Sequence, residues 1–152
     1  MTQYIIYDLD GCIADDRARL PLIDHSQPDP WAKYHEGCDR DPLINKSWAA
    51  LGRLLCTPII FTSRPEVVRA KTQRWLQNVA GLNAERLFMR PDDDHTPSIQ
   101  LKERFLRRLE QTDSLAFSDI VLAFDDRREI LDMYEGYGIK TIQTYYPKGA
   151  LI

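Results

Sequence analysis

The chain has 152 residues, of which 43% are hydrophobic and 28% charged, with a net charge of −3. A chain of this length can bury roughly 70% of its unfolded surface without a structural metal or disulfide, so we expect one domain over residues 1–152. Its apolar runs are too short for a membrane-spanning helix, and the N-terminus lacks a basic region before an apolar one. We therefore predict a cytoplasmic protein with no membrane association. Three cysteines without C-x-x-C spacing argue against a zinc site, and the charge gives no strong attraction to nucleic acid, although a local basic patch would suffice.

Five short apolar runs rich in β-branched and aromatic residues predict strands. They lack the polar alternation of a strand with one solvated face, which is typical of a parallel sheet covered on both faces. The runs are 4–7, 58–61, 87–89, 120–124 and 141–145.

Four segments between these runs repeat apolar residues at helical spacing. Strands that alternate with helices predict an α/β fold, a doubly wound three-layer parallel sheet in which ligands bind beyond the carboxyl ends of the strands. The expected buried positions are Trp48, Leu51, Leu54 and Leu55 in about 46–56; Val68, Trp75, Leu76 and Val79 after Pro65; Leu101, Phe105 and Leu109; and Ile130, Leu131 and Tyr134.

Residues 14–45 differ from the rest of the chain. They contain four prolines and two histidines and show no clear periodicity. Long excursions in compact domains are often lids or binding segments. We expect this insertion after the first strand to form a small cap over the site.

Carboxylates follow two of the predicted strands. Asp8 and Asp10 follow the first strand, and Asp125 and Asp126 follow the fourth. Parallel strands end at the same edge of a sheet, so these groups would repel one another unless a cation lay among them. Oxygen ligands without histidine or cysteine indicate Mg²⁺. The alternative is that these aspartates only cap the helices that follow.

These residues form a pattern that resembles the four motifs of the haloacid dehalogenase (HAD) superfamily. The motifs occur in order and at suitable distances over nearly the whole chain. They are Asp8-Leu9-Asp10-Gly11, Thr62, Lys102 and Asp125-Asp126.

The resemblance implies a HAD-like, Rossmannoid fold and a phosphatase that works through an aspartyl-phosphate. Asp8 would attack phosphorus, and Asp10 would protonate the leaving oxygen and later take a proton from water. Asp8, the backbone carbonyl of Asp10, Asp125 and Asp126 would hold Mg²⁺, and the sequence leaves open which member of the acidic pair binds directly.

The same resemblance assigns Thr62 and Lys102 to the phosphoryl oxygens, whose charge they would stabilise. By itself Lys102 would be a solvated charge on a helix. Further candidates for contact with the substrate phosphate follow strand ends: Ser63, Arg64, Arg90 and Arg127.

A narrower resemblance is to the phosphatase domains of bacteriophage polynucleotide kinase/phosphatases. The matching segments are 38–41, 62–66, 88–92, 101–103 and 124–127. This resemblance implies removal of a 3′-phosphate from nucleic-acid ends or nucleotides, and a separate kinase or ligase partner. Two features depart from it: Cys12 stands where the superfamily usually has Thr, and the sequence lacks the G-x-x-x-x-G-K-[ST] motif of a kinase.

Two other functions stay open at this stage. The first is a nucleoside (deoxy)monophosphate phosphatase with a more closed cap, and the second is a non-catalytic binding module of the same fold. Two basic clusters would favour a nucleic-acid strand if they flanked the site. They are Arg69, Lys71 and Arg74, and Arg104, Arg107 and Arg108. The aromatics of the insertion, Trp31, Tyr34 and His35, suit either base stacking or a small core.

Overall fold

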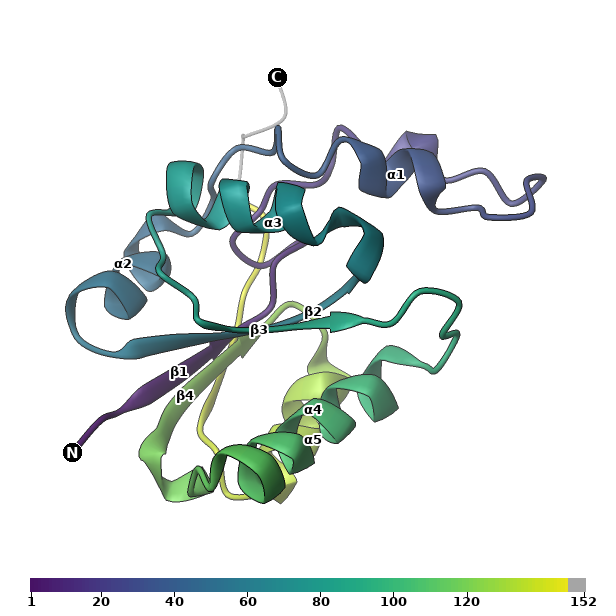
Figure 1. The fold of residues 1–152 in the computed structure, drawn as a ribbon. Helices are drawn as coiled ribbons and strands as arrows, with labels where there is room; N and C mark the ends of the chain where they lie inside the picture. Colours follow the sequence, from purple (N-terminus) through teal and green to yellow (C-terminus); the bar gives the residue numbers. More distant parts are fainter. Residues whose placement is uncertain (148–152) are drawn as a thin grey trace.

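A five-stranded parallel sheet forms the centre of the molecule in the computed structural model, with strand order β3-β2-β1-β4-β5 (Figure 1). The structure describes residues 1–147, and residues 148–152, which the predicted domain includes, lie outside this part. The strands are β1 (Tyr4–Tyr7), β2 (Thr57–Pro65), β3 (Arg86–Arg90), β4 (Ile120–Asp125) and β5 (Thr141–Gln143). The predicted doubly wound α/β fold is confirmed.

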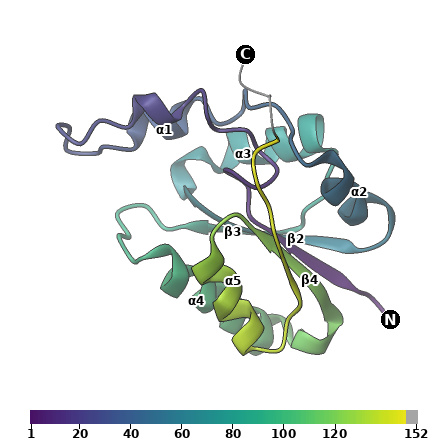
Figure 2. The same ribbon diagram turned by 180° about the vertical axis from the view of Figure 1, so that it is seen from behind.

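Helices cover both faces of the sheet, as Figures 1 and 2 show from opposite sides. On one face lie α2 (Lys46–Leu54) and α3 (Arg69–Trp75), which continues into a π-helical turn (Leu76–Ala80). On the other face lie α4 (Ser98–Asp113) and α5 (Arg128–Gly136). Short helices complete the list: α1 (Ala32–Glu36) and the 3₁₀ turns Leu20–Leu22, Glu66–Val68 and Phe117–Asp119.

Strand β1 divides the core into two clusters, because successive side chains of a strand point to opposite faces. Ile5 and Tyr7 pack towards α2 and α3, whereas Ile6 packs towards α4 and α5. All three are at most 1% exposed. A strand covered on both faces has no polar alternation, which explains its continuous apolar run.

The predicted apolar faces of the later helices are confirmed, but that of α2 is wrong. Helix α2 buries Ala49 and Gly52, whereas Leu54 and Leu55 are 76% and 74% exposed. The reason is its close approach to Tyr7: a Cβ on Gly52 would lie 2.9 Å from the Tyr7 ring. Residues without bulk therefore form the contact. Leu51 is partly buried against the same core, whereas Leu54 and Leu55 are exposed. Val79, on the turn after α3, is likewise 41% exposed.

Strand β2 runs further than its apolar sequence indicates. The run was expected to end at Thr62, but the strand continues to Pro65, which pairs with Arg90 of β3 after a shift in register. This continuation keeps Thr62 within the strand. It also carries Ser63 and Arg64 past Ile60, the last residue of β2 that pairs with β1.

The insertion of residues 14–45 leaves and rejoins the fold at one place. Ala14 forms a β-bridge with Leu43, and the Asp15 amide donates to the Pro42 carbonyl at 2.9 Å. Between these points the chain carries α1, which lies on the α3 side of the molecule (Figure 1). None of the helices in residues 1–147 is long and apolar enough to cross a membrane.

The Tyr7 hydroxyl links β1 to α2, and its removal should destabilise the protein. It donates to the Trp48 carbonyl at 2.7 Å and accepts from the Gly52 amide at 3.0 Å. Tyr7→Phe leaves buried backbone groups without this partner, so we expect a loss of about 1–2 kcal/mol in the free energy of unfolding, measured by urea denaturation. Tyr4→Phe, at the partly buried start of the strand, is the control. Equal stability of Tyr7→Phe and the wild type would contradict this role.

Candidate active site

Three carboxylates meet where the strand order reverses, between β1 and β4. Asp8 follows β1, Asp125 ends β4 and Asp126 follows it. The Asp8 amide donates to the Phe124 carbonyl at 3.0 Å, which places the two strand ends side by side. Carboxylate oxygens of all three residues lie within 4.8 Å of one another. The structure thus brings Asp8 next to the adjacent pair Asp125 and Asp126, which lies near the other end of the sequence.

The ammonium group of Lys102 lies against two of these carboxylates. Its Nζ donates to Oδ1 of Asp8 at 2.9 Å and to Oδ2 of Asp125 at 2.6 Å. Lys102 is 2% exposed in the second turn of α4, so it is not a solvated helix charge. The other oxygen of Asp125 accepts from the Arg127 amide at 3.0 Å.

One ammonium group is too little positive charge for three clustered carboxylates, of which Asp8 and Asp125 are buried and Asp126 is partly buried. Burial raises the pKa of Asp8, and Asp125 and Asp126 raise it further against the opposing charge of Lys102. Burial and the charge of Asp125 likewise raise the pKa of Asp126 to about 6. A second cation would relieve this repulsion, and a donor set made only of carboxylate oxygens fits Mg²⁺. Helix capping alone would not bring these three groups together.

The turn after Asp10 requires glycine for two reasons. Gly11 has φ +80°, and a Cβ there would lie 2.8 Å from Oδ2 of Asp126.

The neighbouring Cys12 is fully buried, and burial raises the pKa of its thiol well above the usual value. Cys12 is therefore a packing residue and not a reactive thiolate.

Asp10 lies in the opposite electrostatic environment from Asp8. Its carboxylate accepts from Nη2 of Arg64 at 2.7 Å and from Nη2 of Arg19 at 2.6 Å. Burial alone would raise the pKa of Asp10, but the two guanidinium groups outweigh it and lower the pKa to about 2. Asp10 is therefore ionised in the free protein, whereas its expected role in the first step needs a proton.

Arg64 is fully buried. Its guanidinium group forms ion pairs with Asp10 and Asp41 and a hydrogen bond to Thr72. This placement differs from the expected contact with a substrate phosphate, because the guanidinium lies behind Asp10. Arg19, from the insertion, joins the same network through a bidentate pair with Asp41 at 2.8 and 2.6 Å. Sequence analysis missed Arg19, since an isolated arginine in a segment without periodicity carries no positional signal.

The remaining candidates lie around the same cavity in different settings. Thr62 is 1% exposed and lines the cavity beside Asp8. The Ser63 hydroxyl is 2.9 Å from that of Ser98, a residue that sequence analysis did not single out. Arg90 donates to the Thr96 carbonyl at 2.6 Å and so holds the loop after β3. Arg127 pairs with Glu129 at the surface, with both side chains 46% exposed.

The cavity over these residues has a volume of about 970 Å³. The insertion forms one wall and the loop of residues 91–97 forms another, and both project in the same direction from the carboxyl ends of the strands (Figures 1 and 2). Five further aspartates line this space: Asp16, Asp29, Asp92, Asp93 and Asp94. Its outer part is thus acidic, which disfavours a long polyanion.

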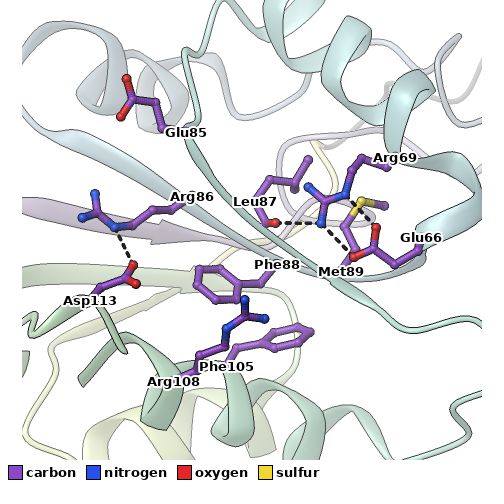
Figure 3. A pocket seen from close by; sticks show the side chains of 10 residues that line it. All are labelled: Glu66, Arg69, Glu85, Arg86, Leu87, Phe88, Met89, Phe105, Arg108 and Asp113. Atoms are coloured by element: carbon purple, nitrogen blue, oxygen red, sulfur yellow. Dashed lines mark hydrogen bonds and ion pairs between the residues drawn. The ribbon is translucent and has the colours of Figure 1, made fainter. Parts of the chain in front are cut away.

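A second cavity of about 300 Å³ lies at the outer edge of β3 (Figure 3). Its arginines are already engaged: Arg69 pairs with Glu66 at 2.6 Å, Arg86 with Asp113 at 3.0 Å, and Arg108 lies over the Phe88 ring. Residues of the four motifs do not line it. Most of the charged side chains in this second cavity are paired with one another, so the cavity does not form a basic surface.

The two predicted basic clusters are paired in a similar way. Lys71 donates to the Glu36 carbonyl, Arg74 lies 3.8 Å from Asp39, and Arg107 pairs with Glu103. Arg104, near the mouth of the large cavity, pairs with Asp94 at 2.8 Å. The ion pairs of Arg104 and Arg107 offset part of the charge expected to hold a strand, whereas Lys71 contacts only a neutral carbonyl.

Comparisons with known proteins agree with this geometry. Residues 2–148 match the profile of the family described as "Polynucleotide kinase PNKP phosphatase domain". A protein of Autographa californica nuclear polyhedrosis virus, described as a bifunctional polynucleotide kinase/RNA ligase, is 24% identical over 93% of this chain, which covers 17% of the viral protein. A chain of the Pnkp1/Rnl/Hen1 RNA repair complex superposes with a TM-score of 0.71 at 21% identity, over 97% of this chain and 44% of that one. A HAD-like hydrolase from Streptococcus pneumoniae has a TM-score of 0.63 at 12% identity, over 97% and 88% of the two chains.

Removal of the Asp126 carboxylate should stabilise the metal-free protein at neutral pH. The pKa of Asp126 is raised to about 6, whereas an unfolded Asp has a pKa of about 3.9. The protonated form of Asp126 therefore contributes to the stability of the folded protein fully below about pH 4. This contribution is lost as the pH rises through 6 and the side chain ionises. In chelator at pH 7, Asp126→Asn should gain on the order of 1–2 kcal/mol in the free energy of unfolding, and the gain should vanish towards pH 4.

Urea denaturation between pH 4.5 and 7.5 measures this effect. Asp132→Asn, whose side chain is 65% exposed and pairs with Arg128, is the matched control. A metal-free wild type that is more stable than Asp126→Asn at pH 7 would contradict the assigned repulsion.

Proposed function

We propose a specific activity for this chain, which belongs to the family of polynucleotide kinase PNKP phosphatase domains and is a HAD-type phosphatase. The proposed activity is that of a Mg²⁺-dependent phosphomonoesterase acting through an aspartyl-phosphate. The observation that supports this proposal most is the cluster of Asp8, Asp125 and Asp126, which within residues 1–147 has one ammonium partner, Lys102. Residues 1–147 supply a nucleophile, an acid–base group and phosphate ligands around one cavity.

Asp8, Asp125 and Asp126 would hold the Mg²⁺, together with the backbone carbonyl of Asp10. The bound ion supplies positive charge that offsets carboxylate repulsion and the charge of the phosphoryl oxygens. This arrangement keeps Asp8 ionised at neutral pH despite its burial.

Asp8 acts as the nucleophile in the first step. One carboxylate oxygen forms a bond to phosphorus while the bond between phosphorus and the ester oxygen breaks, and the ester oxygen leaves as an alcohol with one added proton. In the second step a water oxygen attacks phosphorus, the bond to Asp8 breaks, and Asp10 takes the proton of the water. Phosphate and ionised Asp8 are regenerated.

Thr62 and Lys102 stabilise the transferring group. The Thr62 hydroxyl retains its proton for donation, because its Oγ1 only accepts from the Arg64 amide at 3.2 Å. Lys102 already touches Asp8, so its charge lies where the phosphoryl oxygens arrive. Fixed donors of this kind favour the transition state because they need no rearrangement.

The proton for the leaving oxygen arrives with the substrate. Asp10 is ionised in the free protein, since its pKa is about 2. A phosphate monoester has a second pKa of about 6, so a fraction carries a proton at neutral pH. Asp10 relays this proton to the ester oxygen and is then ionised and ready to accept one from water.

The substrate we propose is a 3′-phosphate on a nucleic-acid end or a nucleotide. Support comes from the family and from relatives described by kinase, RNA ligase and RNA repair names, which also suggest a separate kinase or ligase partner. A nucleoside monophosphate is the second candidate. The acidic mouth of the cavity and the paired arginines favour it over a long strand.

A phosphate-release screen tests the proposed function. It compares 3′- and 5′-phosphorylated oligonucleotides with free 3′- and 5′-mononucleotides. We expect release from a 3′-phosphate in Mg²⁺, loss of release in EDTA and recovery when Mg²⁺ is returned. Asp8→Asn should lower turnover by at least ~10³-fold, because it removes the nucleophile and one oxygen ligand. Asp132→Asn is the surface control. Full activity in EDTA, or in Asp8→Asn, would refute the mechanism.

Asp10→Asn separates the two chemical steps. Asparagine cannot relay a proton, so the first step with a nucleotide should slow by roughly 10²–10⁴-fold. With p-nitrophenyl phosphate, whose leaving group needs no proton, the loss should be much smaller, and a burst of p-nitrophenol should precede slow turnover. Single-turnover measurements on both esters decide this, with thermal melting as a control for lost ion pairs. Equal losses for both esters would mean that Asp10 positions groups instead of moving protons.

A further inference from the structure

His35 is a partly buried residue of the insertion that the chemical steps above do not use. It lies in α1 and lines the large cavity. Its Nδ1 is closed off from solvent and has no hydrogen-bond partner among residues 1–147. Buried polar atoms are rarely left unpaired, so the setting of this nitrogen limits which tautomer the ring can adopt.

The position of His35 relates it to the leaving group. Arg19 donates to Asp10 at 2.6 Å and to the Tyr34 carbonyl, directly before His35, at 2.7 Å. The leaving oxygen must come within hydrogen-bond reach of Asp10. The organic part of the substrate extends beyond that oxygen into the cavity, whose lining includes Trp31 and His35 as well as Asp10.

The orphaned Nδ1 indicates which ring nitrogen carries the proton. Burial lowers the pKa of His35 to about 4, and Arg64 and Arg19 act in the same direction against the charge of Asp10. The ring is therefore neutral and has one N–H. A buried lone pair near two guanidinium groups costs less than a buried N–H, so the proton belongs on Nε2. Nε2–H is then the donor that the ring presents to the cavity.

Trp31 supplies an aromatic surface on the same wall. It is 44% exposed, lines the cavity, and its ring centroid lies 6.3 Å from that of His35. Tyr34 is different: it is 5% exposed and donates to Asp16 at 2.6 Å, which makes it a packing residue. Its ring supports both neighbours, in T-shaped contact with Trp31 at 5.4 Å and with His35 at 4.9 Å. Stacking on an exposed ring suits any base.

We propose that Trp31 and His35 form a nucleoside subsite, in which Trp31 stacks on the base and Nε2–H of His35 donates to a sugar oxygen of the leaving group. This proposal rests on the proposed function, because the nucleoside lies beyond the ester bond that Asp8 and Asp10 cleave. The insertion thereby selects nucleotides over phosphate esters that lack a base.

The test compares two substrates by the ratio of their kcat/KM values: the mononucleotide that the wild type hydrolyses best, and acetyl phosphate, which has no nucleoside. Trp31→Ala should lower the ratio at least ~10-fold and His35→Ala ~3–10-fold, mainly through the KM of the nucleotide. His35→Gln, whose amide nitrogen overlays Nε2, should recover part of the ratio, whereas His35→Asn, which overlays Nδ1, should not. His25→Ala, an exposed histidine of the same insertion, is the control.

Binding of thymidine by calorimetry separates failure of the subsite from failure of the proposed function. We expect thymidine to bind the wild type and to bind Trp31→Ala at least ~10-fold more weakly. Suppose that Trp31→Ala loses thymidine binding but the wild type hydrolyses no nucleotide. This result would support the subsite and refute the proposal that a nucleotide is the substrate. Equal loss on both substrates, recovery by His35→Asn instead of His35→Gln, or equal thymidine affinity in wild type and Trp31→Ala would overturn the subsite.

Discussion

The repulsion among three clustered carboxylates, two of them buried, is the constraint on which the rest of this structure depends. Asp8, Asp125 and Asp126 meet because parallel strands β1 and β4 end together, and burial raises the cost of their charges. Lys102 offsets part of that cost from α4. The charge left unbalanced is negative. In the proposed function a divalent cation would offset it, and the cation together with Lys102 would then face the phosphoryl oxygens.

Two aspartates only two positions apart have opposite protonation tendencies. Asp8 lies among carboxylates, which raise its pKa, whereas Asp10 lies between Arg64 and Arg19, which lower its pKa. Divergent environments for neighbouring carboxyl groups are a common way to divide nucleophilic and acid–base roles. Among the groups that lower the pKa of Asp10, Arg64 of β2 acts most strongly, and Arg19 of the insertion, held by Asp41, adds to it. In the proposed mechanism the insertion would thus support the acid–base group as well as form a wall of the cavity.

The charge around the cavity narrows the range of suitable substrates. Its floor combines Lys102 with carboxylates that can hold a cation, but its outer part carries Asp29 and Asp92–Asp94. A single terminal phosphate can reach the floor, whereas further phosphates of a strand would meet negative charge. Trp31 and His35 offer neutral contacts on the way, which suit a base and a sugar better than a polyanionic backbone.

The sequence by itself determined the strands, the parallel sheet and the Asp8, Asp10, Asp125 and Asp126 positions, because apolar runs and the polar groups that end them are local features. The parallel sheet is confirmed, and the structure places the four aspartates around one cavity. Only tertiary structure decided which face of α2 is buried, since this depends on how closely Tyr7 approaches Gly52. It also decided that Arg64 and Arg19 both pair with Asp10. Ion pairs between distant segments produce no periodic pattern in a sequence, so they could not be predicted from it.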